Sequence, residues 1–287
     1  MPPAPAAITV GTLNIGGLPR PRRPLLRLPE RVAELCRRLD ESDIDVLNLQ
    51  EVFFRTYRTA LREHLPSYRY VAFRRSIFGP AGGLMTFSRL PLRAPSYRSF
   101  LGANATSGGA RFRLAHVLRS ALHGVLVVRL AHAPVTIANT HLTANHDGDW
   151  SIENRHYDLQ RRQLARLNQQ LSRHGRTEVT VVTGDFNIAS DSVHYPVIVD
   201  HGSRRDPFAG TDPTTFHAIF LPAGAAAHRI DYALVAGDSA RFPVLDSATL
   251  FPVPVTVDGI ELYLSDHIGL TIRLGLPEPC TAPGRLD

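Results

Sequence analysis

The sequence predicts a mixed α/β fold, and three observations support this class. Short runs rich in apolar and β-branched residues, typical of strands, recur along the whole chain. Stretches with apolar residues on a helical period lie between several of these runs. Glycine pairs at 16–17, 82–83 and 108–109 mark turns between the predicted elements. With 287 residues, of which 44% are hydrophobic, the chain can also bury a sizeable core.

The apolar runs place the expected strands in chain order. Strands are predicted over residues 8–15, 45–50, 83–87, 124–130, 135–139, 179–183, 230–235 and 268–274. Helices are predicted over residues 28–40, 54–64 and 154–174, the last with Leu159, Leu164, Leu167 and Leu171 on one face. The pair Asp258-Gly259, between two short apolar runs, predicts a tight β-hairpin.

The chain shows no long linker or repeat, which predicts one domain. We expect an unstructured N-terminal arm over residues 1–7, a domain over 8–276 and a flexible tail over 277–287. No apolar run is long enough to cross a bilayer, and the first residues lack the basic and apolar regions of a signal peptide, so we expect a cytoplasmic protein. The distant pair Cys36 and Cys280 suggests no disulfide.

The net charge of +6 raises the question of nucleic acid as a partner. Every basic residue is Arg, however, and these residues are spread along the chain in pairs and are not gathered in one block. Together with abundant Ala and Pro, this bias indicates a GC-rich bacterial genome. Nucleic acid therefore stays a possible but less favoured partner, and we expect a monomer.

The informative feature is the polar residue at the end of six apolar strands, where a purely structural strand would not need one. A lone Asp or Asn there usually forms a turn, but the full set offers oxygen ligands and imidazoles at one edge of a sheet. An oxygen-rich set without Cys suits Mg²⁺, or Mn²⁺, better than Zn²⁺. These residues are Asn14, Glu51, His141, Asp185 with Asn187, Asp231, and Asp266 with His267.

Six motifs around these residues together resemble the endonuclease/exonuclease/phosphatase superfamily, and they follow the superfamily's order from residue 12 to 267. They are Thr12-Leu13-Asn14, Leu49-Gln50-Glu51-Val52, Asn139-Thr140-His141-Leu142, Gly184-Asp185-Phe186-Asn187, Arg229-Ile230-Asp231-Tyr232 and Ser265-Asp266-His267. The resemblance implies a DNase I-like, four-layer sandwich of two packed mixed β-sheets flanked by helices, with a metal site at one end.

Further stretches, such as Gly82-Gly83 running into Ser88-Arg89-Leu90-Pro91, are similar to neutral sphingomyelinases. The hairpin at Asp258-Gly259 lies where secreted relatives carry a hairpin that touches membranes. Here its turn is polar and lacks the bulky aromatic residues of those relatives, so we expect no stable membrane insertion.

The resemblance also suggests roles for the site residues. Glu51, with Asn14 and Asp185, would hold Mg²⁺, and Asp266 is a further candidate near the metal. His267, oriented by Asp231, would take a proton from the attacking water. His141 and Asn187 would stabilise charge on the phosphorus-bound oxygens, and Tyr157 and Arg161 would contact the phosphate. An alternative makes Asp185 the base and His267 an electrostatic partner of the phosphate.

These expectations define a metal-dependent hydrolase of phosphate esters, and three substrate classes fit it. The leading prediction is a sphingomyelinase-like phosphodiesterase acting on a phospholipid, through its head group, or on a related phosphodiester. The alternatives are a phosphomonoesterase of a small metabolite and a DNA nuclease that would need a contiguous Arg face. A non-catalytic binding module is disfavoured, because every required position holds a chemically competent residue.

Overall fold

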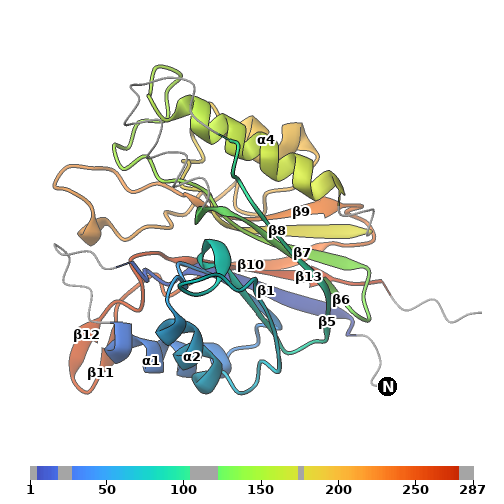
Figure 1. Cartoon of the computed structure of the whole chain (residues 1–287), viewed down its shortest axis with the longest axis vertical. Coiled ribbons are helices and arrows are strands. Elements are labelled where there is room, and N and C mark those ends of the chain that lie inside the picture. Colours follow the sequence, from blue (N-terminus) through green and yellow to red (C-terminus); the bar gives the residue numbers. More distant parts are fainter. Residues whose placement is uncertain (1–4, 19–27, 104–121, 174–177, 278–287) are drawn as a thin grey trace, which may run out of the picture.

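The computed structural model describes residues 5–18, 28–103, 122–173 and 178–277 as two β-sheets packed face to face with helices outside them (Figure 1). The first sheet has the order β10-β13-β1-β2-β4-β3. Its strands are β1 (Ala7–Asn14), β2 (Val46–Gln50), β3 (Tyr70–Ala72), β4 (Met85–Ser88), β10 (Val244–Leu250) and β13 (Gly269–Gly275). The second sheet has the order β5-β6-β7-β8-β9. Its strands are β5 (Leu92–Ser99), β6 (Gly124–Leu130), β7 (Val135–His141), β8 (Val179–Asp185) and β9 (Asp231–Gly237).

Helices cover the outer face of each sheet, which gives the four layers expected from the sequence. α1 (Leu28–Asp40) and α2 (Arg55–His64) lie against the first sheet, and α4 (Tyr157–Arg173) lies against the second (Figure 1). The short helix α5 (Tyr195–Ile198) and three single 3-10 turns, η1 (Ala81–Gly83), η2 (Asp200–Gly202) and η3 (Ala218–Phe220), lie in loops. β11 (Val255–Val257) and β12 (Ile260–Leu262) form the separate hairpin that Asp258-Gly259 predicted.

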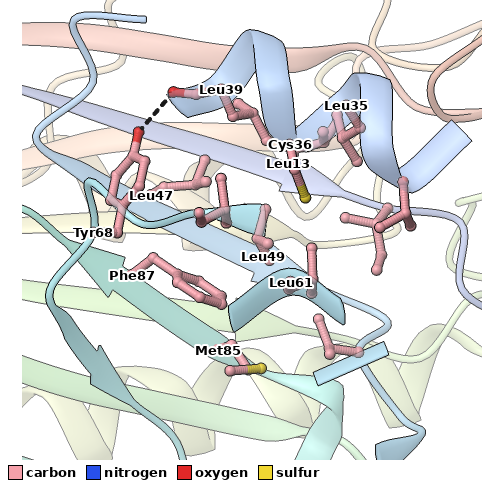
Figure 2. Packing of buried hydrophobic residues seen from close by; sticks show 14 of the residues in the cluster. Leu13, Leu35, Cys36, Leu39, Leu47, Leu49, Leu61, Tyr68, Met85 and Phe87 are labelled. Carbon is pink, nitrogen blue, oxygen red and sulfur yellow. Dashed lines mark hydrogen bonds between the residues drawn. The ribbon is translucent and has the colours of Figure 1, made fainter. Parts of the chain in front are cut away.

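Three buried clusters hold these layers together. The middle cluster joins the two sheets through strand residues such as Val10 and Ile272 from one sheet and Ile137 and Val181 from the other. A second cluster fills the space between the first sheet and helices α1 and α2, where the hydroxyl of Tyr68 donates to the carbonyl of Leu39 (Figure 2). The third lies between the second sheet and α4. Because successive strand residues point to opposite faces of the sheet, a strand such as β2 contributes side chains to two of these clusters.

Three strands were not predicted from the sequence, and all three lie at sheet edges. β3, β5 and β10 have one neighbour each in their sheets and are largely exposed or half-buried. An edge strand needs no continuous apolar run, because one side of it faces solvent, and it tolerates Pro95, which cannot donate a backbone hydrogen bond. The predicted arm and tail fall partly on residues 1–4 and 278–287, which lie outside the described residues, as does Cys280.

Candidate active site

The predicted site residues converge at one edge of the two sheets. Asn14 ends β1 beside Gln50 of the parallel strand β2, and His141 ends β7 beside Asp185 of the parallel strand β8. Asp231 pairs with Asp185 across antiparallel strands. The topology therefore places these side chains together from segments far apart in the sequence.

One detail of the sequence interpretation is corrected by this topology. Asp231 is the first residue of β9, and His267 lies just before β13, so neither residue ends a strand. β9 runs antiparallel to β8, and β13 runs antiparallel to β1. The start of an antiparallel strand lies beside the end of its neighbour, and for this reason the residues still reach the same edge.

The backbone around two site residues has an uncommon conformation. Glu51 and Asn187 have φ angles of 61° and 53°, in the left-handed region that side chains other than Asn and Asp rarely adopt. Gly184, next to Asp185, has a φ of 143°, and a Cβ atom there would lie 1.9 Å from the carbonyl oxygen of Thr140. Strained backbone of this kind concentrates at functional sites, because the surrounding structure must hold it in place.

Below the site, a buried layer of amides and hydroxyls joins the two sheets. Gln50 donates through Nε2 to Asn139 Oδ1 at 2.8 Å, and Asn139 donates in turn to the carbonyls of Leu49 and Met85 at 3.1 and 3.0 Å. Asn48 of the first sheet donates to the hydroxyl of Thr183 in the second at 2.8 Å. These directional bonds fix how the two sheets meet directly beneath the site.

His267 and Asp231 form the buried pair expected from the sequence. His267 Nδ1 lies 2.9 Å from Asp231 Oδ2, and both side chains are buried. Because the carboxylate accepts, Nδ1 carries the proton and Nε2 can accept one in the neutral ring. Burial lowers the pKa of His267, but the charges of Asp231 and Asp185 outweigh it, so the pKa is raised.

Asp185 lies at the centre of the site. Its Oδ2 accepts from Asn14 Nδ2 at 2.9 Å and lies 3.4 Å from His141 Nε2 and 3.7 Å from His267 Nε2. Its Oδ1 accepts from the backbone N–H of Asn187 at 2.8 Å. Burial, followed by the neighbouring charge of Asp231, raises the pKa of Asp185. The Asp185 carboxylate thus lies beside both histidines, and it accepts from the side-chain amide of Asn14 and the backbone N–H of Asn187.

The donor set fits a hard divalent cation. Ligand atoms of Asp185, Asp231 and His267 all lie within 4.8 Å of one another. Asp231 Oδ1 is buried and has no hydrogen-bond partner within the described ranges. Two buried carboxylates this close repel each other, and a bound cation would offset the repulsion. Glu51 adds a third carboxylate, which accepts from the backbone N–H of Leu18 at 3.0 Å and lines the same cavity as Asp185.

Two cavities meet at these residues. The larger, of about 580 Å³, reaches Glu51, His141 and Asp185 and has aromatic walls that include Phe53, Phe78 and Tyr97. The second, of about 290 Å³, reaches His267 and is walled by Trp150 and Phe216. Ala144, His146 and Asn187 line both cavities. A ligand held at Asn187 can therefore extend in two directions.

Asn187 is fixed by its neighbours on several sides. One amide N–H donates to the carbonyl of Leu142 at 2.9 Å, and within the described part of the chain the other N–H has no partner and can bind a ligand. Its own carbonyl accepts from Trp150 Nε1 at 2.9 Å and from Gln160 Nε2 at 3.2 Å. Gln163, also on α4, exchanges two hydrogen bonds with Thr143 in the loop after His141. The inner face of α4 thus supports the loop after His141 and the segment that carries Asn187.

Three predicted residues do not line either cavity. The ring of Tyr157 stacks on His194 at 4.7 Å, and Arg161, with its side chain about half exposed, lies 3.5 Å from Asp158. Neither residue lines either cavity, and the expected phosphate contacts stay a prediction. Asp266 Oδ1 lies 2.6 Å from the position that a Cβ on Gly16 would take. Burial lowers the pKa of the Arg31 guanidinium, and the negative charge of Asp266 opposes this shift.

Sequence reasoning missed several residues that line the cavities, His123 and Trp150 among them. His123 packs edge-on against His141, with ring centroids 4.6 Å apart, and lines the larger cavity. Trp150 walls the smaller cavity and anchors Asn187. The position of His123 could have been inferred from pairing of the predicted strands, since Gly124 pairs with His141. Trp150 carried no such signal, because its loop has no regular pattern.

The family of the chain follows from this arrangement and from a sequence comparison. The model of the Endonuclease/Exonuclease/phosphatase family matches residues 11–267, so the chain belongs to this family. Its members are phosphoester hydrolases that depend on a divalent metal. Comparison with curated proteins found no match.

Solved structures confirm the fold. SmcL is 19% identical over 95% of this chain and 100% of its own, with a TM-score of 0.68. Sphingomyelinase C from Streptomyces griseocarneus is 19% identical over 94% of this chain and 99% of its own, with a TM-score of 0.64. TDP2 from D. rerio, solved with a single-strand DNA product, is 15% identical over 94% of this chain and 100% of its own, with a TM-score of 0.68. At these identities the likeness shows the fold alone.

Proposed function

We propose that this chain is a Mg²⁺-dependent phosphodiesterase whose substrate is a phospholipid or a related diester with an apolar substituent. The observation that carries the proposal is the pair of cavities that meet at Asn187. A phosphodiester has two substituents and needs room on both sides of the phosphorus, whereas a monoester needs room on one. The aromatic walls of the larger cavity suit an apolar group.

Glu51 and Asp185 would hold the metal on the side of the larger cavity, with Asn14 fixing Asp185. When bound, Mg²⁺ would neutralise charge on a phosphate oxygen and on the leaving oxygen. A cation held at Asp185 would favour the neutral form of nearby His267, which is the form that a base requires.

His267 takes the proton of the attacking water at Nε2, because Nδ1 is held by Asp231. The water oxygen bonds to phosphorus as the bond to the leaving oxygen breaks. His141 and the free amide N–H of Asn187 stabilise the charge that gathers on the remaining oxygens. Asp185 is the less suitable base, because each of its oxygens already accepts a hydrogen bond.

A substrate panel tests the proposal. Purified protein with Mg²⁺ would be offered sphingomyelin in detergent, a soluble bis-ester, a soluble mono-ester and an abasic DNA duplex. We expect hydrolysis of sphingomyelin or the bis-ester. Cleavage of the mono-ester alone would indicate a metabolite phosphatase, and cleavage of the duplex alone would indicate a nuclease; either result contradicts the proposal.

A further inference from the structure

A tight turn over residues 76–79 carries two exposed apolar side chains at its tip. Ile77 is 79% exposed and Phe78 is 75% exposed. The backbone N–H of Ser76 donates to the carbonyl of Gly79 at 2.8 Å, and Arg75 and Pro80 pair as an isolated antiparallel bridge. The segment is thus a miniature hairpin, and its tip is apolar where a turn exposed to water is usually polar.

The turn is fixed against the start of α2. The backbone N–H of Arg55 donates to the carbonyl of Phe78 at 3.1 Å, and Arg55 Nη2 donates to the carbonyl of Ile77 at 3.0 Å. A Cβ on Gly79 would lie 2.2 Å from the carbonyl oxygen of Phe53, so only glycine permits this close approach. The two apolar side chains are therefore held outward by a defined backbone.

The apolar tip continues into the larger cavity of the site. Phe78 lines that cavity, together with three further exposed or partly exposed apolar side chains, Leu18, Phe54 and Leu122. These residues form a rim, and Glu51 and His141 lie in the same cavity. A contiguous apolar surface that opens on a reaction centre marks an interaction site.

Basic side chains flank the tip on the protein surface. Arg55, Arg58 and Arg75 line a small neighbouring cavity of about 250 Å³, and Arg74 is exposed beside them. Over the described ranges, none of these four arginines pairs with a carboxylate. An apolar tip surrounded by uncompensated arginines is complementary to a surface with anionic head groups above an apolar interior.

We propose that the turn at residues 76–79 docks the protein on an anionic phospholipid bilayer. Ile77 and Phe78 enter the boundary between head groups and acyl chains, while the arginines contact lipid phosphates. Docking would bring the rim of the larger cavity to the lipid, and this role rests on the proposed function. The contact is peripheral and reversible, because two side chains and a few charges give far less affinity than a spanning helix. Among the described helices, none is long and apolar enough to cross a membrane.

Vesicle co-sedimentation in EDTA tests docking without turnover. The full chain would be mixed with vesicles of phosphatidylcholine alone, and with vesicles that contain about one third phosphatidylglycerol. We expect binding to the anionic vesicles and little to the neutral ones. Ile77→Ser should weaken this binding about tenfold, from the apolar area that it withdraws. Arg75→Gln should weaken it about fivefold, from one lost charge at the surface.

Leu245→Ser serves as the matched control, because Leu245 is also exposed and apolar but lies on the edge strand β10. It should bind as the wild type does. Ile77→Ser and Arg75→Gln should keep wild-type turnover of a soluble bis-ester, since neither residue lines the cavities at the reaction centre.

Absence of binding to anionic vesicles, or equal binding by wild type and Ile77→Ser, would overturn the docking proposal. So would a dimeric wild type that Ile77→Ser converts to a monomer, because the turn would then be a contact between two copies. Binding without hydrolysis of either sphingomyelin or the soluble bis-ester would leave docking supported and the proposed function refuted. Hydrolysis of lipid in detergent without vesicle binding would support the proposed function and refute docking.

Discussion

Replacing Asp231 with Asn tests the pairing that makes His267 a base. The variant keeps the shape of the side chain but removes the charge 2.9 Å from His267 Nδ1. A buried hydrogen bond to a charged group contributes about 1.5–3 kcal/mol, which corresponds to roughly a 10- to 150-fold loss of rate. An Asn amide can also donate to Nδ1 and so favour the wrong tautomer, which raises the expected loss in kcat to about 10⁴-fold.

The assay is kcat for a soluble bis-ester at saturating Mg²⁺, with thermal unfolding as a check that the variant folds. Asp191→Asn is the matched control, because Asp191 also pairs with a histidine, His228, at 3.6 Å, but on the surface. Its kcat should stay within about twofold of wild type, since exposed pairs contribute little. If Asp231→Asn kept a kcat within about threefold of wild type, His267 would not need its buried partner and the proposed role would be wrong.

Two further predictions concern stability. Asn139→Ala should lower the free energy of unfolding by about 1–3 kcal/mol for each buried group that it leaves without a partner. Gln169→Ala, on the exposed face of α4, is the control and should change this free energy by less than about 0.5 kcal/mol. Urea unfolding measures both variants. Burial, and then the charge of Arg161, lower the pKa of His194 to about 4, below its unfolded value of 6.5. The unfolded chain therefore binds a proton first as the pH falls, so the stabilising contribution is present above pH 6.5 and is lost toward pH 4. His194→Gln should lose less Tm than wild type between pH 7 and 5, and an identical pH dependence would contradict this reasoning.

The sequence predicts the central elements of the fold well because each is set by a local pattern. Helix α1 has the predicted bounds, and so does strand β6. Both lie against cores that demand an uninterrupted apolar face. The edge strands β3, β5 and β10 are set instead by pairing with a neighbour, which no local pattern records.

The same distinction between residues set by a local pattern and residues set by tertiary contacts applies to the site. Polar residues at the ends of buried strands are conspicuous in the sequence, and the topology brings Asn14, Asp185 and Asp231 together. His123, Trp150 and the turn at Ile77 owe their places to loops, where composition carries little information on position. The stacking of Tyr157 on His194 likewise joins α4 to a loop, and no local pattern indicates it.

The metal requirement of the site is tested by hydrolysis of a soluble bis-ester by purified wild type and by Glu51→Ala, first in EDTA and then with Mg²⁺ restored. Wild type should be inactive in EDTA and recover with Mg²⁺, while Glu51→Ala should stay folded and inactive at saturating Mg²⁺. Full activity of wild type in EDTA, or of Glu51→Ala with Mg²⁺, would contradict a metal-dependent phosphodiesterase built on this site.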